Sequence, residues 1–85
     1  MPYEIHLTPA AERNLKKLPR HIVPIVQRKI ETLAANPRPQ GVEKMRGEEN
    51  LYRIRTGDYR ILYTIEDRKL IVLVVKIGNR RDVYH

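Results

Sequence analysis

The chain has 85 residues, 41% of them hydrophobic, which allows one compact domain with a modest core. It has no cysteine, which excludes disulfides and thiolate metal sites, and its three histidines are not spaced as a ligand set. Lysine and arginine (17) outnumber acidic residues (10), and the net charge of +7 favours nucleic acid as a partner. The sequence lacks a secretory signal and any apolar run long enough to span a bilayer, so we expect one cytoplasmic domain over residues 1–85 without membrane association.

The first third of the chain predicts a strand followed by two helices. Residues 3–7 alternate apolar and polar side chains, and Thr8-Pro9 then supplies an N-cap and a proline suited to the first helical turn. Apolar residues at helical spacing continue on both sides of Pro19, which indicates a helical hairpin ending at Asn36-Pro37. These residues are Ala11, Leu15 and Leu18 in the first helix and Ile22, Ile25, Val26, Ile30 and Leu33 in the second.

After the proline-rich loop the hydrophobic period changes to two. Residues 51–56, 59–65 and 70–77 predict three strands of a meander. Residues 70–75 are apolar at every position, so we expect that strand to be central and buried on both faces. The predicted class is α+β with order β-α-α-β-β-β, a helical hairpin packed on one face of a twisted, mainly antiparallel four-stranded sheet.

A predicted tight turn fixes the register of the first hairpin. Gly57-Asp58 fits a two-residue type II′ loop, which places Arg55 opposite Arg60. Alternation then separates an apolar face from a face that carries three arginines. The apolar face holds Tyr52, Ile54, Ile61 and Tyr63, and the opposite face holds Arg53, Arg55 and Arg60.

Arginines directly opposite each other destabilise a hairpin, so a polyanionic ligand is one explanation for the arrangement. The alternative is that the arginine stems cover a solvated sheet face while their charged ends separate in water. A four-residue loop over residues 66–69 would place Ile71, Leu73 and Val75 on the arginine face, as an apolar floor for a base or a partner peptide.

Four segments together resemble the RelE/ParE superfamily of toxins from type II toxin–antitoxin systems, and the RelE type in particular. They are Lys44-Met45-Arg46-Gly47, Leu51-Tyr52-Arg53-Ile54-Arg55, Gly57-Asp58-Tyr59-Arg60-Ile61-Leu62-Tyr63 and Gly78-Asn79-Arg80-Arg81-Asp82-Val83-Tyr84. The resemblance covers nearly the whole chain. It implies a RelE-like microbial ribonuclease fold and an endoribonuclease that enters the ribosomal A site and cleaves mRNA without a metal or cofactor. It also implies a cognate antitoxin and a hetero-oligomer with it.

The same resemblance assigns residues. It implies a catalytic set of Arg53, Arg55, Arg60, Arg80 and Tyr84, and RNA contacts from Lys44, Arg46 and Arg81. Some relatives have a lysine at the position of Arg55, and arginine loses a proton far less readily, so Arg55 is a poor general base. Tyr84, His85 or no protein group at all are the alternatives for that role.

Two rival functions share these features. A ParE-type toxin would poison DNA gyrase with the same fold, although the presence of Arg60, Arg80 and Tyr84 favours RNA cleavage. A non-catalytic RNA-binding module would hold RNA by charge and stacking alone.

Overall fold

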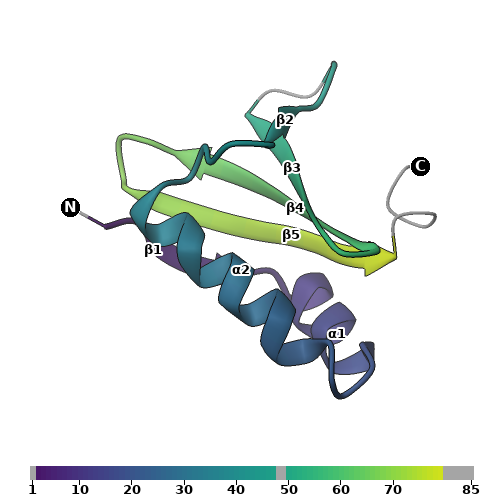
Figure 1. The fold of residues 1–85 in the computed structure, drawn as a ribbon. Helices are drawn as coiled ribbons and strands as arrows, with labels where there is room; N and C mark the ends of the chain where they lie inside the picture. The colour runs from purple at the N-terminus through teal and green to yellow at the C-terminus, as the bar shows by residue number, and fades with distance from the viewer. Residues whose placement is uncertain (1, 48–49, 80–85) are drawn as a thin grey trace.

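The computed structural model describes residues 2–47 and 50–79 (Figure 1). Its elements are β1 (Glu4–Leu7), α1 (Pro9–Lys17), α2 (Val23–Ala35), β2 (Glu43–Lys44), β3 (Leu51–Thr56), β4 (Tyr59–Glu66) and β5 (Ile71–Asn79). The strands form one sheet in the order β1-β5-β4-β3-β2, with β1 parallel to β5 and the other neighbours antiparallel. The predicted class is confirmed, but the sheet has five strands instead of four, because the two residues of β2 add an edge beside β3.

The helix boundaries follow the predicted capping signals. The Thr8 hydroxyl accepts a hydrogen bond from the Ala11 amide at 3.1 Å, and Pro9 occupies the first turn of α1. The longer α2 also has a proline in its first turn and ends at Asn36. No helix within the described ranges is long and apolar enough to cross a bilayer.

Both helices pack on the same face of the sheet and cover the core (Figure 1). From α2, Val26, Ile30 and Leu33 are buried, whereas Ile25 is 49% exposed. Ile25 shares the helical spacing of these residues, but the buried stripe of α2 follows positions 26, 30 and 33, which leaves residue 25 beyond its edge. The sheet contributes Tyr52, Ile54, Ile61, Tyr63, Ile65, Val72, Val74 and Ile77 to the same core.

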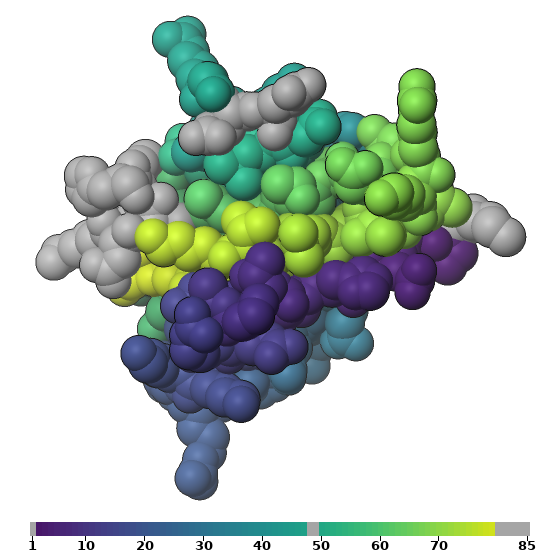
Figure 2. Space-filling model, turned by 180° about the vertical axis from the view of Figure 1, so that it is seen from behind, coloured from purple at the N-terminus to yellow at the C-terminus, as the bar shows by residue number. Residues whose placement is uncertain are grey.

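The last strand is central, as predicted, but it is not buried on both faces. Val72 and Val74 are fully buried beneath the helices, while Ile71 and Leu73 on the other face are only half-buried. Neither helix of the described residues covers that face. Figure 2 shows β1 in purple beside β5 in yellow, with β4 in green beyond it. The apolar run therefore reflects cover on one side and a partly open apolar surface on the other.

The predicted register of the first hairpin is confirmed throughout. Arg55 pairs with Arg60 and Tyr52 with Tyr63, and Gly57 has φ +61° while Asp58 keeps a negative φ, as a type II′ turn requires. The second loop spans residues 67–70, one position later than predicted but equally long. Ile71 and Leu73 thus lie on the arginine face, as expected, while Val75 falls at a β-bulge opposite Leu62 and Tyr63.

A cluster of polar and aromatic side chains anchors the loop between α2 and β2. Arg38 donates two hydrogen bonds to Asp67, at 3.1 and 2.9 Å, and lies over the Tyr52 ring at 5.3 Å. The Tyr3 hydroxyl donates to the same carboxylate at 2.7 Å. We call Tyr3, Arg38, Tyr52 and Asp67 the clasp. It ties the loop to the β4–β5 turn and the N-terminus.

Candidate nucleic-acid interface

The three predicted arginines of the first hairpin lie together on the helix-free face of the sheet. Arg55 and Arg60 are direct cross-strand partners, and Arg53 lies two residues before Arg55 on the same strand. The surroundings differ, because Arg55 is exposed, the Arg53 side chain is 18% exposed and Arg60 is 6% exposed. A nearly buried guanidinium loses little further side-chain freedom when it binds an anion, so Arg60 is the most preorganised of the three.

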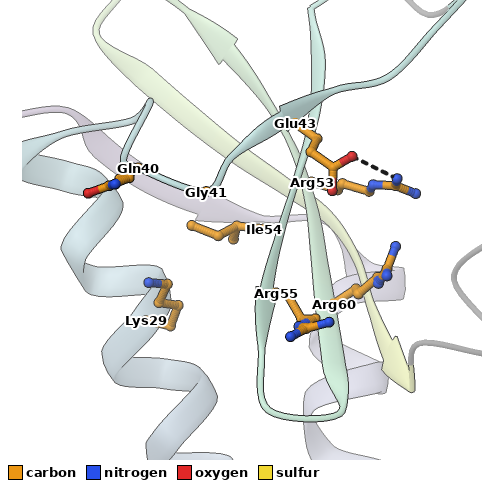
Figure 3. Close-up of a pocket in the computed structure, with 8 residues that line it drawn as sticks. All are labelled: Lys29, Gln40, Gly41, Glu43, Arg53, Ile54, Arg55 and Arg60. Atoms are coloured by element: carbon orange, nitrogen blue, oxygen red, sulfur yellow. Dashed lines mark hydrogen bonds and ion pairs between the residues drawn. The ribbon is translucent and has the colours of Figure 1, made fainter.

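These arginines line a groove of about 330 Å³ at the edge of the sheet (Figure 3). The hairpin contributes Arg53, Ile54, Arg55 and Arg60, α2 contributes Lys29, and the segment before β3 contributes Gln40, Gly41 and Glu43. Counting the described residues, four cationic side chains and one carboxylate therefore surround the groove, an excess of three positive charges. Such a groove attracts an RNA backbone and provides guanidinium donors for its phosphates.

Glu43 forms an ion pair within the groove. Its Oε2 lies 3.0 Å from Nη2 of Arg53, and the two residues are direct partners in the β2–β3 register. The hydrogen bond from Arg53, the attraction of the same guanidinium and a smaller attraction from Arg60 lower the pKa of Glu43. The carboxylate is therefore ionised at neutral pH while its side chain stays 62% exposed.

On the side away from β3, strand β4 of the hairpin pairs with β5, the last described strand. Gly78 on β5 lies directly opposite Arg60, so the position paired with this arginine carries no side chain. β5 ends at Asn79, the partner of Tyr59, and the chain therefore leaves the described residues next to the arginine pair. The predicted site residues Arg80, Arg81 and Tyr84, and the alternative base His85, lie outside the described residues, so their roles stay predictions.

The predicted RNA contacts Lys44 and Arg46 are exposed but do not line the groove. Lys44 is paired with Tyr52, so alternation along β2 turns it to the opposite face from Glu43. The structure does not gather these two residues with the arginines, and an RNA contact from either would extend beyond the groove.

Sequence reasoning missed the groove residues Lys29 and Glu43. A two-residue strand gives no detectable alternation, so nothing in the sequence showed that Glu43 would face Arg53. Lys29 follows the usual polar pattern of a helix surface, and only the packing of α2 beside β3 brings it to the groove. Across residues 2–47 and 50–79, no three histidine, aspartate or glutamate side chains form a metal-ligand cluster, and metal independence itself stays a prediction.

Comparison with known proteins places this chain and its fold among toxins of toxin–antitoxin systems. The chain belongs to the family described as the ParE toxin of type II toxin–antitoxin systems, which matches residues 5–84. Among its relatives, the toxin RelG of Mycobacterium tuberculosis is 33% identical over 99% of this chain and 98% of its own length. The mRNA interferase toxin RelE of Escherichia coli K12 is 28% identical over 94% of this chain and 85% of its own length.

A solved structure agrees with this assignment. The crystal structure of the RelBE2 toxin–antitoxin complex from Mycobacterium tuberculosis contains a chain that superposes with a TM-score of 0.83 at 30% identity, over 94% of this chain and all of that one. The resemblance inferred from the arginine motifs is therefore confirmed at the level of family and fold.

Proposed function

We propose that this protein is the toxin of a type II toxin–antitoxin system and inhibits translation by cleaving mRNA in the ribosomal A site. The observation that carries the proposal is the convergence of Arg53, Arg55 and Arg60 in one groove at the edge of the sheet. A relative of nearly the same length bears the name mRNA interferase, which supports cleavage rather than binding alone.

The reaction we propose is attack of a ribose 2′-hydroxyl on the adjacent phosphate. The P–O5′ bond breaks, leaving a 2′,3′-cyclic phosphate and a 5′-hydroxyl end. Negative charge builds on the phosphate oxygens, and a guanidinium aimed at those oxygens stabilises it without a metal. Arg60, held in place by burial, takes this role, with Arg53 and Arg55 binding the same or neighbouring phosphates.

The C-terminal residues complete the proposed site. Arg80 would stabilise the same charge or the leaving 5′-oxygen, and Tyr84 would stack on the nucleobase or transfer a proton. The partners in this proposal are a cognate antitoxin, the ribosome and mRNA, with the toxin held as a hetero-oligomer until the antitoxin is lost. A cytoplasmic location belongs to the same proposal.

A ribosome-programmed cleavage assay tests this function. Purified toxin is added to ribosomes carrying a message with a defined A-site codon, and the cut position and the chemistry of the new 3′ end are measured. We expect a cut in the A-site codon and a cyclic phosphate. Arg60→Ala should slow the cut by about 10²–10³-fold, the usual effect of removing one oxyanion donor.

The matched control is Arg68→Ala, which removes an exposed arginine from the turn at the opposite end of β4. It should cleave at the wild-type rate. An intact message together with inhibited supercoiling by DNA gyrase would overturn the proposal in favour of a gyrase poison. Tight binding to the programmed ribosome without any cut would instead favour a non-catalytic RNA-binding module.

A further inference from the structure

We propose that Glu43 is the general base of the reaction and accepts the proton of the attacking 2′-hydroxyl. This inference rests on the proposed function, because it assigns a role within the same RNA-cleaving groove. The residue lies on β2, a strand that gives no signal in the sequence, and the family resemblance assigned it no role.

The position of Glu43 places a carboxylate among the groups that would bind the reacting phosphate. β2 pairs with β3 so that Glu43 faces Arg53, and the two side chains are joined at 3.0 Å. Figure 3 shows this pair in the same groove as Arg55 and Arg60. A phosphate bound by these guanidinium groups would bring the adjacent ribose into the groove that contains Glu43. The Glu43 side chain is 62% exposed and is therefore accessible to a substrate hydroxyl.

The chemistry of the groove then narrows the choice of proton acceptor. The other ionisable residues in the described part of its lining are Lys29, Arg53, Arg55 and Arg60, which are cations at neutral pH. Guanidinium groups stay protonated far above neutral pH, and an ammonium has no free lone pair. Among the described residues that line the groove, only Glu43 carries a carboxylate, and it can accept a proton through either oxygen.

The ion pair with Arg53 has two consequences for such a base. It orients the carboxylate, and it lowers the pKa of Glu43, which favours the ionised form that can accept a proton but also makes that form a weaker base. In the step itself, the 2′-oxygen bonds to phosphorus while its proton moves to Glu43, and the P–O5′ bond breaks. The 5′-oxygen takes a proton from solvent and Glu43 later returns its proton to solvent, so the reaction consumes none.

Glu43→Gln separates proton transfer from positioning. The amide oxygen of glutamine still accepts a hydrogen bond from Arg53, but it is too weakly basic to take the proton. We expect ribosome-programmed cleavage to slow by about 10²–10⁴-fold, the range for loss of a general base. Binding of a message with a 2′-deoxy nucleotide at the cut position, which cannot be cleaved, should be unchanged or tighter.

Two further variants complete the test. Glu66→Gln makes the same change at an exposed position at the far end of β4, outside the groove, and should cleave normally. Glu43→Asp keeps a carboxylate and should recover part of the lost rate. If wild-type protein cleaves and Glu43→Gln cleaves equally fast or faster, the general-base role is overturned while the proposed function stands.

A loss of binding that accounts for the whole loss of cleavage would also overturn the role, because it would make Glu43 only a support for Arg53. Failure of the wild-type protein to cut the message would remove both proposals together. The binding measurement thus distinguishes a failed inference about Glu43 from a failed function.

Discussion

Arg55 and Arg60 face each other across the hairpin, although like charges at directly opposite positions are unfavourable. The apolar core contacts of the hairpin come from its other face. The arrangement is explained if these residues bind an anion, because the substrate phosphate then lies between charges that repel each other in the free protein. Stability and function therefore oppose each other at this pair.

Replacing Arg55 by threonine should show this opposition directly. Threonine suits a strand, and removal of the repulsion should raise the free energy of unfolding by roughly 0.2–1 kcal/mol. The same variant should cleave mRNA more slowly, because one phosphate-binding cation is lost. Urea unfolding and the ribosome-programmed assay measure the two effects.

Arg68→Thr serves as the control, since this arginine lies in the exposed β4–β5 turn, away from the hairpin pair. It should leave the cleavage rate unchanged. A variant of Arg55 that lost stability along with activity would show that the arginine supports the fold, contrary to this reading.

The positions of individual site residues could be predicted from the sequence where a local feature, such as a tight turn, determines the strand register. The Gly57-Asp58 turn sets the register, and the register places three arginines on one face. Glu43 could not be found in the same way, because its position depends on a strand of two residues whose pairing is decided by the folded sheet. The C-terminal residues Arg80 and Tyr84 were assigned through the resemblance and stay predictions.

Among the elements, the segment between α2 and β3 contributes Gln40, Gly41 and Glu43 to the groove. Its only regular secondary structure in the described residues is the two-residue strand β2. The clasp compensates by fixing Arg38, at the start of this segment, to Asp67 and Tyr52. A second anchor comes from Tyr63, whose hydroxyl donates to the Pro37 carbonyl at 2.8 Å.

The clasp makes the free energy of unfolding depend on pH in the acidic range. Hydrogen bonds from Arg38 and Tyr3 lower the pKa of Asp67 to about 2, below the value of about 3.9 of an unfolded aspartate. A carboxyl group with a lowered folded-state pKa stabilises the fold fully above the unfolded value, and this stabilisation is lost as the pH falls toward 2. We expect the unfolding free energy of the wild type to fall more steeply between about pH 4 and about pH 2 than that of Asp67→Asn.

Asp58→Asn is the matched control, because asparagine is also accepted in the hairpin turn that contains Asp58. Its pH dependence should follow the wild type. Parallel curves for wild type and Asp67→Asn would contradict the role given to the clasp. Urea unfolding at several pH values gives both curves.

The errors in the predicted elements have a common cause. Helix ends were predictable because caps and prolines act locally, whereas β2 and the half-open face of β5 depend on which parts of the sheet the helices reach. An uninterrupted apolar run is compatible with cover on one face or on two. In the described part of the chain both helices lie on one face of the sheet, which leaves the other face without a helical layer.

For the molecule as a whole, one face of the sheet supports folding and the other carries the proposed RNA-binding residues. The helices and the core occupy one face, and the arginines occupy the other, where they do not disturb core packing. The net charge of +7 adds long-range attraction for RNA. Binding of single strands should therefore depend strongly on salt, and the dependence should be traceable to particular residues.

The salt dependence gives a test of which cations contact phosphate. Each phosphate contact to a single strand contributes about −0.7 to the slope of log affinity against log salt concentration. With an uncleavable 2′-O-methyl oligonucleotide, Arg55→Ala should flatten the slope by about 0.7, while Arg68→Ala should leave it unchanged. Arg53→Ala should flatten it less, because Glu43 already offsets the charge of Arg53 in the free protein. Equal slopes for Arg55→Ala and Arg68→Ala would mean that RNA binds elsewhere on the surface. This result would contradict the assignment of the arginine groove as the RNA site.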